Sequence, residues 1–421
     1  MFGLTFSRWY LFGAAFVVQF CIGCIYSWSV LNHPIDLAVY NNPTKGRAVN
    51  AFYIAIGVFG VATSLMGPTI ERKGPSKVYL PTIDAVGLSW MFVLLGGIMS
   101  IAMFASALVL RVPPPNYTVN GLDIHGDRVD ENLLEEKLEG SYRAVQTPTG
   151  ADNEVSASSS IKKLTLKQAL LTPDYIFMYI MFFANQLFGV IVLSRLSSMC
   201  TDIFNKSAGT ASDIVSINSA FNCCGRLAFP AISDVLVRYL KIEKTFARKV
   251  LYYFTLGAQV IVIGSLPTVI RHDSYTVFVI EIFVLTCSYG GGFGTIPAFV
   301  ADMFGAYNIG PMHGIILTAM AIGGVAGGLS FNHAYNDKIA DGMSVGEAYI
   351  DNIQIIFVVV CIGFAVLFLV RTNAKDRFEP GYHYSVCGKR VVSIPPKEKD
   401  VMKRQEAEAA TATDKLPETA V

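Results

Sequence analysis

Nine long apolar segments are the feature that most restricts the fold of this chain. A bilayer core about 30 Å thick needs roughly 20 apolar residues to cross it as a helix. Helices satisfy their own backbone hydrogen bonds in lipid, so such segments can span it side by side. We therefore predict an all-α polytopic membrane protein, with spans at 10–31, 48–70, 86–110, 173–195, 209–232, 250–270, 275–300, 311–334 and 351–371.

Composition supports this class and excludes others. The chain is 52% hydrophobic and 15% charged, whereas soluble domains carry about 25% charged residues. A net charge of +1 gives no basic face, so we predict no nucleic-acid partner. The eight cysteines suggest neither a metal site nor a disulfide framework, because most lie inside apolar runs, where cysteine packs as a small hydrophobe. No nucleophile–base set is present, so we predict no enzyme activity and no cofactor.

Two polar regions interrupt the apolar pattern. Residues 112–165 contain an acidic group and few aromatic residues, and they show no apolar periodicity, so we predict a disordered linker. Residues 372–421 are also polar and are predicted to form a disordered tail. The first apolar run, at 10–31, is too long for a signal peptide, whose core is about 7–15 residues. The chain is therefore predicted to be a multi-pass protein of the plasma membrane or an organelle membrane.

Loop charges predict the orientation. Lys and Arg gather at 71–77, at 237–249 and after the last span, whereas the loop 200–208 on the other side carries one Lys. Positive loops stay in the cytoplasm, so these three clusters, the linker and the tail are predicted to be cytoplasmic. The last six spans then alternate consistently.

The first half does not alternate consistently. Arg8 places the N-terminus inside, and two spans return the chain to the cytoplasm at 71–77. The span 86–110 alone would then end outside, where a cytoplasmic linker cannot begin. Residues 80–110 are too few for two spans, which need roughly 40 residues. An odd number of helices is therefore predicted to be missing from this half.

Motifs in both halves resemble the major facilitator superfamily. GPTIERKGPSK (67–77) resembles the family loop after helix two, and GRLAFPAISD (225–234) is a weaker echo of it after helix eight. The more specific motifs are RWYLFGAAFVVQFCIGCIYSWSV (8–30), GGGFGTIPAFVADMFG (290–305) and MHGIILTAMAIGG (312–324). These are similar to the oxalate:formate antiporter branch of the wider monocarboxylate-transporter-like group.

The resemblance implies a secondary active transporter with twelve helices in two six-helix halves. On that plan 10–31 and 48–70 match helices one and two, and 86–110 matches helix six. Helices three to five are then absent at a junction near 79–84, and three is an odd number, as the loop charges require. The predicted organisation is a truncated superfamily fold with about nine of twelve spans, comprising an incomplete N-terminal half at 1–111 with three spans, the linker at 112–165, a six-helix C-terminal half at 166–371 and the tail at 372–421.

Arg226 is the first candidate for substrate binding. It lies eight residues before Asp234, or roughly 12 Å into the predicted span at ~1.5 Å per residue. A charge at this depth is costly, and guanidinium binds a carboxylate through two parallel hydrogen bonds. The resemblance implies that an arginine at this place contacts the substrate carboxylate. Asn222, one turn earlier on the same face, could orient it or line the pore, and a helix–helix hydrogen bond is an equal alternative. The alternative is an arginine that extends to the lipid headgroups.

Four other polar or aromatic residues are predicted to line the path. Tyr26 and Trp28 end the first span, where aromatic residues of the antiporter branch help enclose substrate; an interfacial belt is the alternative. Gln19 and Gln186 lie mid-span and suggest a cavity face. Glu281 is a candidate for proton coupling because an acid inside the membrane titrates when desolvated, although it also fits an interfacial position.

The sequence departs from the antiporter pattern at Met320, where the oxalate:formate antiporter has a lysine that pairs with its dianion. With one buried cation, a monoanion is the more plausible substrate. We predict alternating-access transport of small, monocarboxylate-like organic anions, by exchange or proton coupling, in a form that the missing helices could leave inactive. The alternative is a non-transporting truncated isoform that regulates or binds other proteins.

Overall fold

The computed structural model describes residues 29–30, 32, 35–36, 46–57, 61, 166–305, 309–373, 376–377, 381–386 and 389–395. The predicted linker at 112–165, the span 86–110 and the junction near 79–84 lie outside these residues. So does the span 10–31 apart from its last residues. The described part of the span 48–70 includes a helix at Ala48–Gly57.

The predicted C-terminal half forms six helices that are long and apolar enough to cross a membrane. All six predicted spans are confirmed, and most of the helices run past the predicted ends because their terminal turns are polar. The elements are α8 (Leu166–Leu170), α9 (Pro173–Val192), η4 (Leu193–Arg195), α10 (Leu196–Asp202), α11 (Ala208–Tyr239), α12 (Lys244–Arg271), α13 (Tyr275–Phe304), α14 (Ile309–Ile322), η5 (Gly323–Gly327), α15 (Gly328–Ala340), α16 (Val345–Leu369), β1 (Tyr382–Val386) and β2 (Lys389–Ile394).

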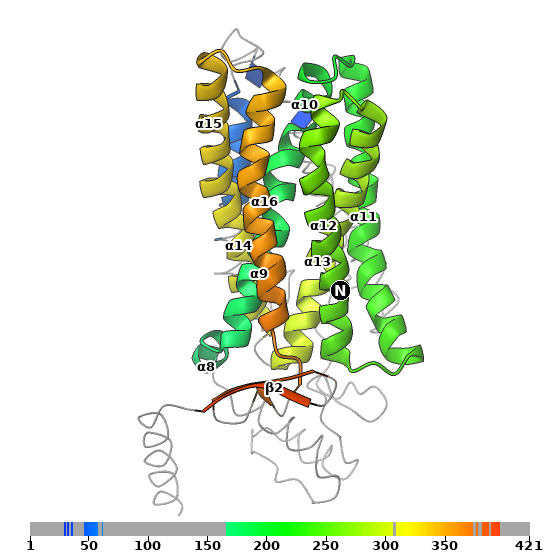
Figure 1. Ribbon diagram of the computed structural model, residues 1–421, viewed down its shortest axis with the longest axis vertical. Helices are drawn as coiled ribbons and strands as arrows, with labels where there is room; N and C mark the ends of the chain where they lie inside the picture. The colour runs from blue at the N-terminus through cyan, green and yellow to red at the C-terminus, as the bar shows by residue number, and fades with distance from the viewer. Residues whose placement is uncertain are drawn as a thin grey trace, which may run out of the picture.

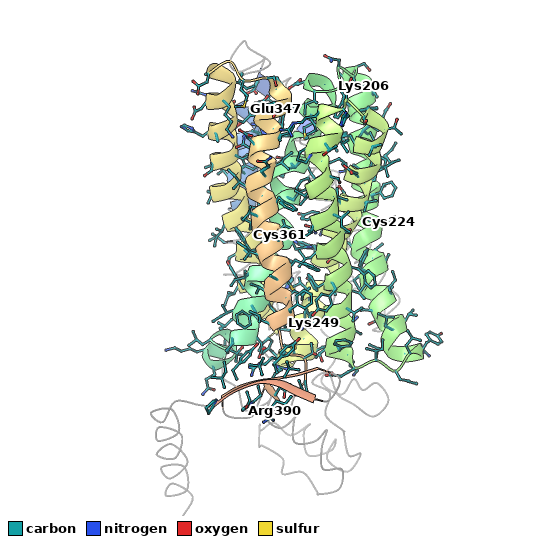
Figure 2. All side chains as sticks on the ribbon, in the orientation of Figure 1. Lys206, Cys224, Lys249, Glu347, Cys361 and Arg390 are labelled. Carbon is teal, nitrogen blue, oxygen red and sulfur yellow. The ribbon has the colours of Figure 1, made fainter. Side chains whose placement is uncertain are left out.

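The six spans run up and down as one bundle (Figure 1). The hairpin β1–β2 lies across one end of the bundle, next to α8, and we call this the hairpin end. Lys249 lies near the hairpin end, whereas Lys206 and Glu347 lie at the opposite end (Figure 2). By the loop charges, the hairpin end is the one predicted to face the cytoplasm.

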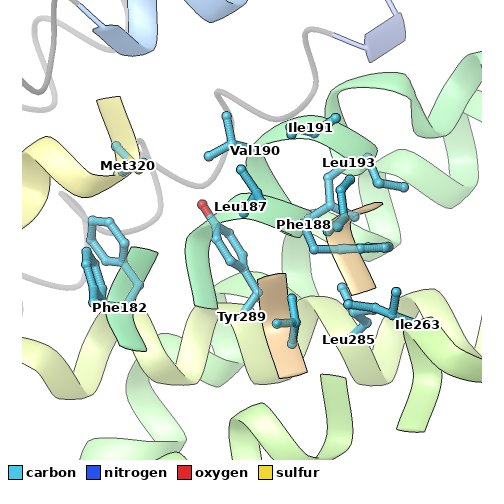
Figure 3. Close-up of a cluster of buried hydrophobic side chains, with 14 of the residues drawn as sticks. Phe182, Leu187, Phe188, Val190, Ile191, Leu193, Ile263, Leu285, Tyr289 and Met320 are labelled. Carbon is cyan, nitrogen blue, oxygen red and sulfur yellow. The ribbon is translucent and has the colours of Figure 1, made fainter. Parts of the chain in front are cut away.

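The hydrophobic core lies among α9, α12 and α13. Leu187 and Phe188 of α9 face Leu285 and Tyr289 of α13, and Ile263 of α12 lies beside Leu285 (Figure 3). All five side chains are buried. Helices that pack this closely need small residues where their backbones meet.

Glycines provide that close approach between α11 and α13. A Cβ added at Gly225 would lie 2.1 Å from the carbonyl oxygen of Cys287, and one at Gly294 would lie 2.2 Å from the carbonyl oxygen of Arg226. Both distances are below van der Waals contact. The two helices can therefore pack as they do only with glycine at these positions.

The helix Ala48–Gly57 packs against the interrupted span made by α14, η5 and α15. A Cβ at Gly57 would lie 2.3 Å from a methyl group of Val325, and one at Gly328 would lie 2.4 Å from the Tyr53 ring. The five-residue element η5 is a π-helical turn, and such turns occur mostly as single insertions at functional positions. The first half therefore meets the second half at a span whose helix is already irregular.

The antiparallel hairpin is bonded to the helix ends above it. Lys249 Nζ donates to the carbonyl of Val370 (2.6 Å) and to the hydroxyl of Tyr384 (3.1 Å). The Asp376 carboxylate accepts from the backbone N–H (2.6 Å) and the hydroxyl (2.9 Å) of Ser385. The hairpin is thus held by side chains rather than by a core of its own.

This hairpin corrects one prediction. The region 372–421 was expected to be disordered because it is polar and lacks a core, yet residues 381–386 and 389–395 are ordered by contacts with the bundle. Arg248 and Lys249 of the cationic loop 237–249 are likewise buried rather than solvated. Arg248 pairs with Asp234 at 2.7 Å.

Candidate functional site

A polar stripe runs along one face of α11. Asn218, Asn222 and Arg226 are spaced four residues apart, so a helix places them on one side, one turn above another. All three side chains are buried, and Arg226 is only 3% exposed. Most of the remaining surface of α11 is not buried, so the buried face is also the polar one.

Arg226 is held from two directions. Its Nε donates to the Asn222 side-chain oxygen at 2.7 Å, and its guanidinium lies over the Phe293 ring, 4.0 Å from the centroid. The backbone behind it is fixed by Gly294, as described above. The Asn222 side-chain oxygen accepts this bond, whereas its Nδ2 has no hydrogen-bond partner among the described residues. A buried donor of this kind is available to a ligand.

The predicted residue Gln186 lies on α9 and is fully buried. Its Nε2 donates to the neighbouring Asn185 side chain at 2.9 Å, while its own oxygen has no partner. A Cβ at Gly292 would lie 2.3 Å from that Asn185 oxygen, so the polar pair touches α13 one residue before Phe293. Phe293 in turn contacts both α9 and Arg226. The two polar groups therefore border the same part of α13.

Glu281 lies between α12 and α13. It accepts a hydrogen bond from the Ser265 hydroxyl at 2.6 Å through one carboxylate oxygen, and the other oxygen is buried without a partner. The side chain is partly buried rather than fully exposed at a membrane interface. Its hydrogen bond to Ser265 is made at another position along the bundle from the Arg226 bond to Asn222.

Three predicted site residues, Gln19, Tyr26 and Trp28, lie outside the described residues. Met320, at the position where the antiporter has a lysine, is buried in the core. The structure thus brings Arg226 and Asn222 together on α11. It places Gln186 next to α13, which also contacts Arg226, and it leaves Glu281 apart.

Arg195 is a buried cation that the sequence reasoning missed. The predicted span ended at this residue, which made it look like an interfacial charge. The helical path instead continues through α10 to Asp202, so Arg195 lies inside the span and is only 5% exposed. The signal was present in the sequence, since the polar run after Arg195 still contains Leu196, Met199 and Cys200 on an apolar face.

A bundle of six helices that are long and apolar enough to cross a membrane, with buried polar and cationic groups, defines the class of integral, multi-pass membrane proteins. The chain belongs to the Major Facilitator Superfamily, whose family model matches residues 46–328, more than half of the sequence. Transport, rather than an enzyme reaction, is the activity of this family's named members.

The chain is also similar to a curated protein and to solved structures. YhjX of Escherichia coli (strain K12), described as an uncharacterized MFS-type transporter, is 21% identical over 360 residues, which cover 76% of this chain and 86% of YhjX. Among solved structures, the chain is similar to a bacterial homologue of the iron transporter ferroportin in its outward-facing state, with TM-score 0.42, 12% identity, and coverage of 84% of this chain and 98% of that one. The same homologue soaked with iron gives TM-score 0.41 and 11% identity, covering 83% and 98%.

Proposed function

We propose that this protein carries small organic anions of the carboxylate class by alternating access, and that Arg226 binds the substrate carboxylate. The observation that carries the proposal is the setting of Arg226, which is buried, bonded to Asn222 and stacked on Phe293. A charge within a span costs about 2.5–3.5 kcal/mol by insertion measurements, so it is retained where it has a partner or a role.

The geometry suits a carboxylate for a specific reason. Asn222 fixes the plane of the guanidinium through Nε, and the terminal Nη groups are the pair that forms a fork with two carboxylate oxygens. The unpartnered Nδ2 of Asn222 supplies a further donor on the same helix face. Phe293 covers one face of the guanidinium and keeps water from it, which strengthens the ion pair.

Three finer parts of the proposal come from the sequence. The substrate is monocarboxylate-like, as in the oxalate:formate antiporter and monocarboxylate-transporter-like branch. Coupling is by exchange or by protons, with Glu281 as the proton carrier. Three helices are missing from the N-terminal half, which leaves this form inactive if the two halves can no longer enclose a path.

Ligand binding tests Arg226 in the chain as it exists. Purified protein in detergent is heated in sodium acetate, sodium lactate or sodium oxalate, with sodium chloride of equal ionic strength as reference. A ligand at 100 times its Kd stabilises a protein by about 2.7 kcal/mol, so binding raises the unfolding temperature. Arg226→Lys is expected to weaken carboxylate binding at Arg226 about tenfold, because it loses the planar fork, so the same rise in unfolding temperature needs about ten times the carboxylate concentration.

The matched control is Arg238→Lys, an exposed arginine near the end of the same helix, which should respond as the native protein does. An unchanged carboxylate response in both Arg226→Lys and Arg226→Gln would contradict the proposal. Uptake of labelled acetate into liposomes, at several pH values and with Glu281→Gln, then tests transport and coupling. Uptake that is independent of pH would remove Glu281 from the mechanism.

The missing helices are tested by sequencing the transcript across codons 77–86. If the transcript encodes the absent helices, transport belongs to that longer chain and the uptake measurement is made with it. An abundant transcript with the junction as given, whose product binds no carboxylate, would instead favour the non-transporting isoform.

A further inference from the structure

Arg195 lies where a long helix is broken. The break consists of the three-residue 3₁₀ turn η4, and Arg195 itself has φ −116° and ψ 6° at the start of α10. This is the bridge region of backbone conformation, in which many functional residues are found. A 3₁₀ stretch within a helix often marks a hinge. The backbone of Arg195 therefore departs from the regular α-helical conformation of a continuous span.

The Arg195 side chain is enclosed by polar and aromatic groups. Its Nη2 donates to the side-chain oxygen of Asn332, and its Nη1 lies 3.5 Å from the hydroxyl of Tyr349. The guanidinium carbon is 4.8 Å from the Tyr335 ring centroid and 5.6 Å from that of Phe331. Two rings and two neutral polar groups thus form the cage.

No carboxylate of the described residues pairs with Arg195, and its Nε has no hydrogen-bond partner. A buried cation without a counter-ion is costly, and cation–π contacts offset only a small part of that cost. An anion from outside the protein would neutralise the charge of Arg195 and accept a hydrogen bond from its Nε. The cage therefore has the chemistry of a carboxylate site whose ligand is replaced, in this conformation, by the Asn332 oxygen.

Asn332 also joins the two parts of the molecule. Its Nδ2 donates to the carbonyl of Gly46 (2.7 Å) and to the side-chain oxygen of Asn50 (2.8 Å). The Asn332 side-chain amide therefore accepts from Arg195 and also holds the helix Ala48–Gly57 against α15. Release of this contact would free Arg195 for a ligand and open the bundle at the end opposite the hairpin.

Arg195 and Arg226 are too far apart to share one small anion. At ~1.5 Å per residue, Arg195 lies about 10 Å from the end of α10, whereas Arg226 lies about 27 Å from the start of α11. These helix ends are neighbours, joined by a short loop at 203–207. The two guanidinium groups are thus separated by roughly 17 Å along the bundle.

We propose that Arg195 forms a second carboxylate-binding site, which takes the anion from the end opposite the hairpin when Ala48–Gly57 separates from α15. This inference rests on the proposed function, because it assumes the same class of substrate. The incoming carboxylate accepts from Arg195 Nε and Nη2 and displaces Asn332. Rebinding of Asn332 returns the site to the closed form seen here and sends the anion onward.

The test compares sodium acetate with sodium chloride in thermal unfolding of the purified full chain, for native protein, Arg195→Gln, Arg226→Gln and the double variant. Sites more than about 10 Å apart act additively, so each single variant should lose part of the acetate response and the double variant all of it. In Arg195→Lys, the part of the stabilisation that depends on Arg195 should need about ten times more acetate, because a lysine keeps the charge and loses the fork.

The outcomes separate this inference from the proposed function. A full native response in Arg195→Gln overturns the second site. A full native response in Arg226→Gln, with loss in Arg195→Gln, overturns the role of Arg226 and leaves the second site standing. No acetate response in the native protein overturns both.

Asn332→Asp provides an independent variant if Arg195→Gln does not fold. It keeps the shape of the side chain and places a fixed carboxylate against Arg195, which should exclude acetate from this site alone. An undiminished acetate response in Asn332→Asp would overturn the inference.

Discussion

Arg371 and Asp174 form a buried ion pair that joins the start of α9 to the end of α16, the first and last spans of the C-terminal bundle. Arg371 donates to Asp174 from Nε (3.1 Å), from Nη2 (2.7 Å) and from its backbone N–H (3.0 Å), across 197 residues of sequence. The side chains are only 4% and 2% exposed. A second cation, Arg377, has its Nε 3.8 Å from the same carboxylate, and burial lowers the pKa of Arg377 to about 10, so it remains charged at neutral pH.

Replacing this carboxylate should destabilise the bundle strongly. Asp174→Asn keeps the shape but removes the carboxylate charge that pairs with buried Arg371, and breaking a buried pair in this way costs about 3–5 kcal/mol. The free energy of unfolding, measured by denaturant or heat in detergent, should fall by that amount. Glu347→Gln is the control, because the pair of Glu347 with Arg271 is exposed and should give no measurable change. Equal effects of the two substitutions would contradict the assigned role of Asp174.

The hairpin should loosen without loss of the helices when its carboxylate anchor is removed. Asp376→Ala deletes the acceptor for two hydrogen bonds from Ser385. Hydrogen exchange should become faster in β1 and β2 and stay unchanged in α9 and α16. Asp341→Ala, at an exposed position after α15, serves as the control. Unchanged exchange in the hairpin of Asp376→Ala would show that other contacts hold it.

The contact between α11 and α13 should tolerate no side chain at Gly294. Gly294→Ala places a methyl group 2.2 Å from the Arg226 carbonyl oxygen, so the helices must move apart. We expect overpacking to cost about 1–3 kcal/mol and to disturb carboxylate binding at Arg226. Gly257→Ala is the control within a span, because its methyl group would meet only the Phe364 ring at 3.8 Å. That substitution should be neutral or stabilising, by up to about 1 kcal/mol, since alanine favours helix.

The orientation is testable by labelling from one side of the membrane. In a chain whose eight native cysteines are replaced by serine, Asn205→Cys lies in an exposed loop, and Lys244→Cys lies at the exposed first residue of α12, at the opposite end of the bundle. An impermeant maleimide should label position 205 in intact cells and position 244 only after permeabilisation, because the charged loop is predicted to be cytoplasmic. The reverse pattern would invert the predicted topology.

The six spans were predictable because twenty consecutive apolar residues have few alternatives to a membrane helix. Their ends were not, because terminal turns are polar and look like loops in the sequence. Arg195 shows the consequence. Because the predicted span ended at this arginine, Arg195 was not considered as a cation within the span, and the argument made at Met320 counted only one buried cation.

Partners between distant segments were also beyond the sequence. The pairing of Arg226 with Asn222 follows from helical spacing and was predicted, whereas the approach of Phe293 from another helix was not. Lys249 was counted among the cytoplasmic loop charges, and the structure shows that it donates to backbone oxygens at the end of α16 and to a hairpin tyrosine. Hydropathy and charge describe one segment at a time, so they cannot indicate which cation a neighbouring segment will bury.

The glycines between α11 and α13 limit how this site can diversify. Gly294 touches the main chain of Arg226, so α11 and α13 are already as close as their backbones allow. The arginine therefore cannot be repositioned by bringing the two helices closer together. A change of substrate would have to come from the side chains that surround the guanidinium, such as Asn222 and Phe293. Under the proposed function, selectivity is therefore changed by substituting the side chains around the guanidinium, because the close packing of α11 and α13 fixes their spacing.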